Sequence, residues 1–282
     1  MFLFQYLKIV YNNIESIRGL IMNRIQIKGL NDFNKYKSLL SELVRKDIKM
    51  KYRNSVLGVL WSFLDPLFRM IVLTVVFSAL FNRVEHYPVY YLTGHMIYTL
   101  FVGASNQAMM SLVNSAGIWK SIYVPKYLYA LSAVLSNFVT YLLSLLVLFA
   151  IMLVTGVPFT VYIIFISLPI LITLVMAMGA GLILGTMNVF FRDVEHLYSV
   201  FTLMLMYALP LFYPAEIIPD QFRFIQIYNP MFYLVNCSRD CFLYGKLYGL
   251  HEILIPAVAA IILLAIGIFL LRKYQDRFIL YV

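Results

Sequence analysis

Long apolar runs, separated by short polar segments, dominate the chain. A helix of about 20 residues crosses a hydrocarbon core of about 30 Å, and six runs are close to that length or longer. They lie at about residues 60–82, 89–113, 128–154, 161–190, 197–214 and 253–271. The pattern predicts an all-α membrane protein with six transmembrane helices. We expect the fourth helix, which is long, to tilt or bend near Pro169.

An amphipathic stretch leads directly into the first apolar run. Its apolar residues recur at helical spacing and are Leu39, Leu40, Leu43, Val44 and Ile48. Its basic residues, suited to anionic headgroups, are Arg45, Lys46, Lys49, Lys51 and Arg53. A helix of this kind is typical of a membrane surface. We therefore predict an interfacial region at residues 1–56 before a transmembrane domain at 57–282. Residues 1–28 form either a second interfacial helix or a partly disordered extension.

Composition supports a membrane protein and argues against a soluble one. Hydrophobic residues make up 62% of the chain, charged residues 12%, and the mean hydropathy is +0.85. A soluble core of 282 residues cannot bury that much apolar surface. The net charge is +9, but the basic residues lie at the ends of apolar runs, so we do not expect nucleic-acid binding.

The basic residues also predict the orientation in the membrane. Of the 22 Lys and Arg residues, 17 lie before the first run, after the last run or in alternate loops. Positive residues in short flanking loops are retained on the cytoplasmic side. Both termini are therefore predicted to be cytoplasmic.

The outer segment between the fifth and sixth runs is too long for a turn and too apolar for a solvated loop. Helix-interrupting prolines recur in it, at Pro210, Pro214, Pro219 and Pro230. Irregular backbone at membrane depth is tolerated only against protein or a water-filled cavity. We predict short broken helices that dip back into the membrane and form an outer gate at about residues 214–251.

A charged pair lies near the start of the first run. Asp65 and Arg69 are four residues apart, on one helical face, and can neutralise one another. We expect a buried pair that faces the interior. It either lines a conduit, or holds a gate closed, or is a structural ion pair at the interface.

Aromatic residues, 16% of the chain, cluster near the first and fifth runs, as Trp61, Phe63, Phe68, Tyr207, Phe212 and Tyr213. Aromatic faces can stack on the rings of a ligand, and weak repeated contacts suit a passage in which a ligand binds and leaves. Each residue taken alone fits lipid contact or core packing as well. With Asp65, Arg69 and Glu216, these aromatics are our candidate channel and gate residues.

Several patterns indicate structure rather than chemistry. Gly181 and Gly185, extended by Ala177, permit close helix packing, most simply within one subunit. Cys237 and Cys241 have no nearby His, and we expect two free thiols and no metal site. No Ser, His and carboxylate set stands out, and no GxxxxGK[ST] loop is present. We therefore predict a protein that is not an enzyme and has no cofactor in this chain.

Three segments together resemble a known family: RKDIKMKYRNSVLGVLWSFLDPLFRMIVLTVVFS, FFRDVEHL, and YPAEIIPDQFRFIQIYNPMFYLVNCSRDCFLYG. Over residues 36–282 the chain resembles the ABC-2 type permeases that export lipid-linked polysaccharides such as O-antigen, capsule or teichoic acid. The resemblance implies a homodimer in the bacterial cytoplasmic (inner) membrane, enclosing a channel for a lipid-linked glycan. It also implies two ATP-binding subunits, which hold the ATP and Mg²⁺.

The same resemblance points to a coupling loop at about residues 115–127. Its candidate contacts to the ATP-binding subunit are Gly117, Trp119, Lys120, Tyr123 and Lys126. The aromatics could instead form an interfacial belt. Arg192 and Asp193 are a second candidate contact, or a helix cap with a local ion pair. Two other functions stay open: ABC-2 export of a drug or lipid, and a polyprenyl-linked glycan transferase, for which the 13 acidic residues are too dispersed.

Overall fold

The computed structural model describes residues 29–53, 55–77, 84–121 and 124–281. The expectation for residues 1–28, and the candidate contact Tyr123, lie outside this part of the chain. Helices, turns and short loops account for what is described, with no strand. The chain divides into two compact units, residues 1–42 and 43–282, and one helix begins in the first and ends in the second.

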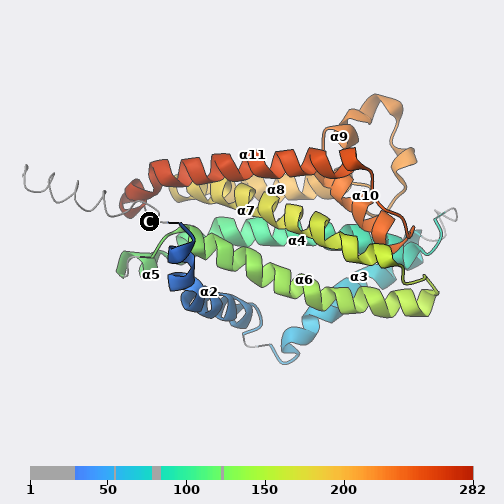
Figure 1. Ribbon diagram of the computed structural model, residues 1–282, viewed down its shortest axis with the longest axis horizontal. Helices are drawn as coiled ribbons and strands as arrows, with labels where there is room; N and C mark the ends of the chain where they lie inside the picture. Colours follow the sequence, from blue (N-terminus) through green and yellow to red (C-terminus); the bar gives the residue numbers. More distant parts are fainter. Residues whose placement is uncertain (1–28, 54, 78–83, 122–123, 282) are drawn as a thin grey trace, which may run out of the picture. The chain divides into compact units, whose positions relative to one another are not determined.

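The helices follow the apolar runs of the sequence (Figure 1). The α-helices of the described residues are α2 (Gly29–Lys51), α3 (Trp61–Phe77), α4 (Tyr87–Asn114), α5 (Ala116–Ser121), α6 (Tyr127–Thr155), α7 (Ser167–Phe190), α8 (Asp193–Ala208), α9 (Phe224–Ile227), α10 (Pro230–Phe242) and α11 (Leu250–Tyr274). The short 3₁₀ helices are η1 (Gly58–Leu60), η2 (Val161–Ile166), η3 (Ala215–Ile217), η4 (Asp220–Phe222) and η5 (Gln275–Leu280).

Five helical stretches of the described chain are long and apolar enough to cross a membrane, and they match five of the six predicted spans. They are Gly58–Phe77, Tyr87–Asn114, Tyr127–Thr155, Val161–Phe190 and Leu250–Leu280. The predicted span at 197–214 corresponds to α8, which has 16 residues. This helix ends at Ala208 because Leu209 is extended, as a residue before proline prefers. A sixth crossing therefore stays a prediction.

Small residues allow α7 to pack closely between α4 and α11 in the larger unit (Figure 1). A Cβ atom on Gly185 would lie 3.0 Å from Leu112 Cδ1 on α4. A Cβ atom on Gly179 would lie 2.5 Å from the carbonyl carbon of Leu263 on α11. Side chains at these positions would push the helices apart. The predicted use of the Gly181–Gly185 pattern, packing within one subunit, is confirmed, because Gly181 also faces Ala108 of α4.

The fourth predicted span changes its helix type close to Pro169. It begins as η2 and continues as α7 from Ser167. Pro169 lies in the first turn of α7, where a missing amide proton costs no helical hydrogen bond.

Two ends of this bundle matter for function, and each is named here after one residue. The Lys126 end holds the last turn of α4, the short helix α5, the start of α6, and the ends of α7 and α11 with η5. The Arg239 end holds the start of α4, the segment after α8, α10 and the start of α11. In Figure 1 the Lys126 end lies on the left and the Arg239 end on the right.

The chain between α8 and α11 is broken at its prolines, as predicted. Pro210 follows α8, Pro214 and Pro219 precede the two 3₁₀ turns, and Pro230 is the first residue of α10. A proline at a first helical position has a suitable φ and needs no amide donor. The short broken helices are thus confirmed, and their depth in a membrane stays a prediction.

Candidate functional site

A groove of about 610 Å³ brings together residues from three distant parts of the sequence. It lies between α3, α4 and the end of α8 with the segment that follows, and we call it the α3–α8 groove. Five of the predicted channel residues line it: Asp65, Phe68, Arg69, Tyr207 and Phe212. Tyr91 and His95 of α4 form its floor. The sequence therefore identified the walls of this groove, although not the contribution of α4.

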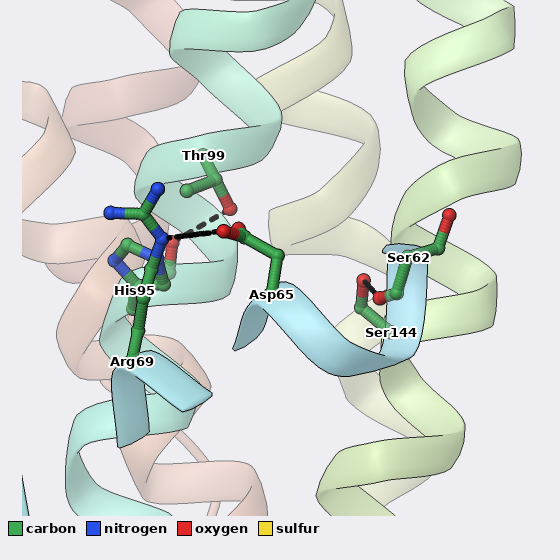
Figure 2. Close-up of polar contacts among 6 residues, drawn as sticks. All are labelled: Ser62, Asp65, Arg69, His95, Thr99 and Ser144. Atoms are coloured by element: carbon green, nitrogen blue, oxygen red, sulfur yellow. Dashed lines mark hydrogen bonds and ion pairs between the residues drawn. The ribbon is translucent and has the colours of Figure 1, made fainter. Parts of the chain in front are cut away.

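The Asp65–Arg69 pair forms as predicted, but it is not buried. The Nε atom of Arg69 donates to both carboxylate oxygens of Asp65, at 2.9 and 3.1 Å (Figure 2). The side chains of Arg69 and Asp65 are 58% and 54% exposed. The expectation of a buried pair is wrong for the single chain, because α3 packs through one face only. That face carries Ser62, Pro66 and Met70.

Polar contacts fix this part of α3 against its neighbours (Figure 2). The hydroxyl of Ser144 on α6 donates to the carbonyl of Ser62 at 3.2 Å. The Ser62 hydroxyl is itself hydrogen-bonded to the hydroxyl of Tyr52. The bond from the Thr99 hydroxyl to the carbonyl of His95, at 2.9 Å, lies within α4 and does not involve α3. The start of α3 is thus anchored, while its charged pair stays at the surface of the chain.

Asp65 and His95 also line a second hollow, of about 570 Å³, between α3, α4 and α6. We call it the α3–α6 hollow. The predicted channel residue Trp61 lies here and not in the groove, and Phe63 is half-buried and lines neither. The six aromatics grouped from the sequence therefore do not form one surface.

Three of these aromatics do form one cluster on the wall of the groove. The ring of Phe212 lies 5.9 Å from that of Tyr207 and 5.3 Å from that of Tyr213, both at steep angles. The hydroxyl of Tyr213 donates to the carbonyl of Tyr207 at 2.5 Å. Phe68 and Tyr207 are 52% and 59% exposed. Exposed ring faces of this kind can stack on a sugar ring.

A buried arginine positions the backbone that carries this cluster. Arg239 is 3% exposed, and its Nη2 atom donates to the carbonyls of Pro210, at 2.5 Å, and Leu211, at 3.4 Å. Its guanidinium carbon lies 3.6 Å from the centre of the Tyr90 ring. Delocalised charge and several donors suit arginine to such a site.

Two tyrosines of α4 complete this support. Tyr87 donates to the carbonyl of Phe212 at 2.8 Å, and Tyr90 donates to that of Tyr213 at 2.9 Å. No role for Arg239 was predicted from the sequence. The available signal was weak, because Arg239 stands between Ser238 and Asp240 and its carbonyl partners lie far away in the sequence.

The predicted gate residue Glu216 lies in another place. It lines a hollow of about 1010 Å³ at the Arg239 end, together with Arg239, Asp240 and Lys246. Asp240 pairs with Lys246 at 3.3 Å. Burial raises the pKa of the Asp240 carboxyl, and the nearby Lys246 partly offsets that effect. Both cysteines are buried free thiols, as predicted.

At the Lys126 end, α5 occupies the middle of the predicted coupling loop. Trp119 is 7% exposed, and its Nε1 atom donates to the carbonyl of Leu112 at 2.9 Å. Trp119 therefore faces the interior, whereas Gly117 and Lys120 are exposed. A protein that docks on α5 would meet these exposed residues and not the tryptophan.

Lys126 also points inward. Its Nζ atom lies 4.8 Å from the centre of the Trp119 ring and 5.0 Å from that of Phe278, and it donates to the carbonyl of Gln275 at 2.5 Å. Burial lowers the pKa of Lys126, and Asp276 opposes that shift. The ammonium group thus joins α5, the start of α6 and η5.

Phe190, at the end of α7, extends this cluster. Its ring makes edge contacts with those of Tyr274, Phe278 and Tyr281, at 5.9, 5.9 and 4.8 Å. The second candidate contact, Arg192 and Asp193, follows directly and is exposed. Arg192 is the residue before α8 and makes no side-chain cap bond. Asp193 lies in the first turn of α8, where a carboxylate complements the helix dipole.

The amphipathic pattern of α2 is present in its last turns. Leu43 is buried, whereas the five basic residues named above are exposed: Arg45, Lys46, Lys49, Lys51 and Arg53. Ser132 of α6 donates to Asp47 at 2.9 Å, and Lys51 donates to Thr140 at 3.3 Å. These bonds hold the end of α2 against α6.

Comparison with known proteins places these features in a family. The model of the ABC-2 type transporter family matches residues 38–243. The chain is 28% identical over 242 residues to the O-antigen export system permease protein RfbA of Klebsiella pneumoniae, covering 85% of this chain and 93% of that protein. It is 25% identical over 259 residues to the protein of the same name in Myxococcus xanthus, covering 89% and 98%.

A third relative carries a different name. The chain is 21% identical over 249 residues to the polysialic acid transport protein KpsM of Escherichia coli, covering 86% of this chain and 96% of that protein. The family match spans well over half of the chain and includes α3, the α3–α8 groove and α10. The chain is therefore a member of the ABC-2 type transporter family.

Proposed function

We propose that this chain is the membrane-spanning subunit of an ATP-driven exporter that moves lipid-linked polysaccharide across the bacterial cytoplasmic membrane. The names of its relatives, which refer to O-antigen export and polysialic acid transport, support a polysaccharide cargo. In this proposal two copies of the chain form the passage. Two ATP-binding subunits, which hold ATP and Mg²⁺, supply the energy.

The α3–α8 groove is the observation that carries the proposal. It combines exposed aromatic faces with a carboxylate and a guanidinium that have hydrogen-bonding capacity left for sugar hydroxyls. In a two-fold symmetric dimer the same surface meets its own copy, so two grooves would enclose one passage. Weak stacking lets a polymer bind and leave repeatedly, which transport requires.

The topology of the proposal has six crossings with the Lys126 end in the cytoplasm. The distribution of 17 of the 22 basic residues supports this orientation. A helix of 16 residues is about 24 Å long, so α8 covers most of a hydrocarbon core of about 30 Å. Residues 209–213, held by Arg239 and two tyrosines, would complete the fifth crossing.

Movement would enter the chain through α5. Its exposed residues Gly117 and Lys120 would contact the ATP-binding subunit, and Trp119 and Lys126 would transmit the displacement to α4, α6 and η5. At the opposite end the broken helices at residues 214–242 would form the outer gate.

Transport by the purified complex tests the proposal. The chain and its ATP-binding partner are reconstituted in vesicles, and ATP-dependent movement of a lipid-linked glycan is measured. Replacing Phe68 and Tyr207 by Ala should lower the rate about tenfold or more, because both exposed stacking faces are removed. The matched control is Phe269→Ala, an exposed phenylalanine of α11 away from the groove.

Two results would contradict the proposed function. One is glycosyl transfer by this chain alone, which would indicate an enzyme. The other is glycan movement that is equally fast without ATP or without the ATP-binding partner.

A further inference from the structure

A separate polar cavity lies beneath the end of α2. It has a volume of about 430 Å³ and is enclosed by the last turns of α2, the second half of α4 and the first half of α6. We call it the interface cavity. Side-chain amides from α4 line it, Asn106 and Gln107 among them, and so do hydroxyls from α6, including Tyr129. Such hydrogen-bonding groups can bind a polar ligand that occupies the cavity.

One of these hydroxyls lacks a partner. Tyr129 is 2% exposed, and its buried hydroxyl has no hydrogen-bond partner within the described chain. Buried polar groups are nearly always hydrogen-bonded, and an unpaired one costs free energy. An acceptor that occupied the interface cavity would satisfy this donor.

The mouth of the cavity is positively charged. Lys46 and Lys51 line it from α2, and both side chains are exposed. The one carboxylate among the lining residues, Asp47, is engaged by the hydroxyl of Ser132 at 2.9 Å. Burial raises the pKa of Asp47, and the Ser132 hydrogen bond and the nearby Lys46 oppose that shift. Two exposed ammonium groups beside neutral donors favour a phosphate.

The cavity adjoins a second hollow of the bundle. It shares Lys51, Gly103 and Asn137 with the α3–α6 hollow, whose lining includes Trp61 and Tyr141. α4 and α6 approach closely at this shared boundary, since a Cβ atom on Gly103 would lie 2.9 Å from the amide oxygen of Asn137. A ligand with a charged head and a longer body would place its head at the lysines and its body toward this boundary.

We propose that the interface cavity binds the phosphate headgroup of a membrane lipid from the cytoplasmic leaflet. Lys46 and Lys51 contact the phosphate, and the hydroxyl of Tyr129 donates to it. The assignment to the cytoplasmic leaflet rests on the proposed function, in which the Lys126 end of the bundle lies on the cytoplasmic side. A polyprenyl-phosphate carrier and an anionic phospholipid present the same chemistry to this site, so the experiment compares them.

Lipid binding to the full complex tests the proposal. The chain and its ATP-binding partner are purified in detergent, and binding of polyprenyl phosphate, phosphatidylglycerol and phosphate-free diacylglycerol is measured by native mass spectrometry. The double variant Lys46→Gln, Lys51→Gln should weaken binding of a phosphate lipid roughly tenfold. Tyr129→Phe, which removes one donor, should weaken it about threefold. Lys37→Gln, an exposed lysine on the same helix, is the matched control.

A second variant tests the position of the lipid body and not the charge. Gly103→Leu adds a side chain at the boundary shared by the two hollows and leaves both lysines in place, so it should weaken binding of the long polyprenyl phosphate more than that of phosphatidylglycerol. Preference for polyprenyl phosphate in the wild-type complex would identify a loading site for the cargo carrier. Equal binding of the two phosphate lipids would identify a phospholipid site, and both results support the proposal.

Other results would overturn it. Diacylglycerol that binds as tightly as the phosphate lipids would remove the role of the phosphate. Equal binding by the double lysine variant and the Lys37→Gln control would remove the role of the cavity. Transport assays separate this failure from a failure of the proposed function. If the cavity variants bind phosphate lipids normally and the complex still exports glycan, the lipid site is wrong and the proposed function stands.

Discussion

The Lys126 end and the Arg239 end are both stabilised by a cation that packs against aromatic rings, but the surroundings of the two cations differ. Each has a cation against aromatic rings that also donates to main-chain carbonyls: Lys126 beside Trp119 and Phe278, and Arg239 beside Tyr90. Lys126 makes one carbonyl bond beside a cluster formed by Phe190, Tyr274, Phe278 and Tyr281. Arg239 donates to three carbonyls, those of Tyr90, Pro210 and Leu211, beside a hollow of about 1010 Å³. The Lys126 end is thus held mainly by ring contacts, whereas the segment at residues 210–213 combines ring contacts of Phe212 with several hydrogen bonds from buried donors.

The largest effect expected from this comparison is at Arg239. Arg239→Met removes the donor to the carbonyls of Pro210 and Leu211 and should destabilise the folded chain by about 3 kcal/mol. Thermal unfolding of the purified protein measures the loss. Arg223→Met is the control, because Arg223 forms an exposed ion pair with Asp220 and its loss should cost less than about 1 kcal/mol. Equal losses for the two variants would contradict the role of Arg239.

A smaller effect is expected at Lys126. Lys126→Met keeps the apolar stem but loses the bond to Gln275 and the attraction to two rings, so it should cost about 1 to 2 kcal/mol. Hydrogen exchange at residues 275–281 should become faster, while exchange at 210–213 stays unchanged. Lys120→Met, at an exposed position of α5, should leave both segments as they are. Faster hydrogen exchange at residues 210–213 in Lys126→Met would contradict the view that the two ends are stabilised separately.

The tyrosines at the Arg239 end sharpen the comparison further. Tyr87→Phe and Tyr90→Phe each remove one hydrogen bond to the segment that carries Phe212 and Tyr213, and each should cost about 1 kcal/mol. Because both tyrosines hold the same short segment, the double variant should show a coupling between them. Strict additivity in thermal unfolding would mean that they act on separate structures.

The smallest effect on stability is expected at the exposed ion pair. Asp65→Asn and Arg69→Gln should each change the unfolding free energy by less than about 1 kcal/mol, since surface pairs contribute little. Their effect on transport should be larger, because both side chains line the α3–α8 groove. A large loss of stability together with normal transport would show that the Asp65–Arg69 pair has a structural role and no role in transport.

The sequence predicted the helices better than the surfaces they form. Apolar run length located five spans, prolines marked the breaks after α8, and Gly181 and Gly185 correctly indicated close packing. These features depend on local composition and on the size of a side chain, which a sequence displays directly.

The sequence did not predict which side chains are exposed and which are buried. Spacing placed Asp65 and Arg69 on one helical face, but only the structure shows that α3 is covered along Ser62, Pro66 and Met70. Trp119 was expected at a partner surface and is buried against Leu112. The role of Arg239 depends on carbonyls nearly 30 residues earlier in the chain, and no local pattern encodes that contact.

The most direct test of the account asks whether glycan occupies the α3–α8 groove during transport. Phe68→Cys places a reactive thiol on the wall of the groove, and Lys37→Cys places one at an exposed position of α2 as a control, while the native cysteines are buried. Labelling by a water-soluble maleimide is measured in the reconstituted complex with ATP, with and without lipid-linked glycan. The account predicts that glycan protects the thiol at position 68 and not the one at position 37. Equal labelling at position 68 with and without glycan would contradict it.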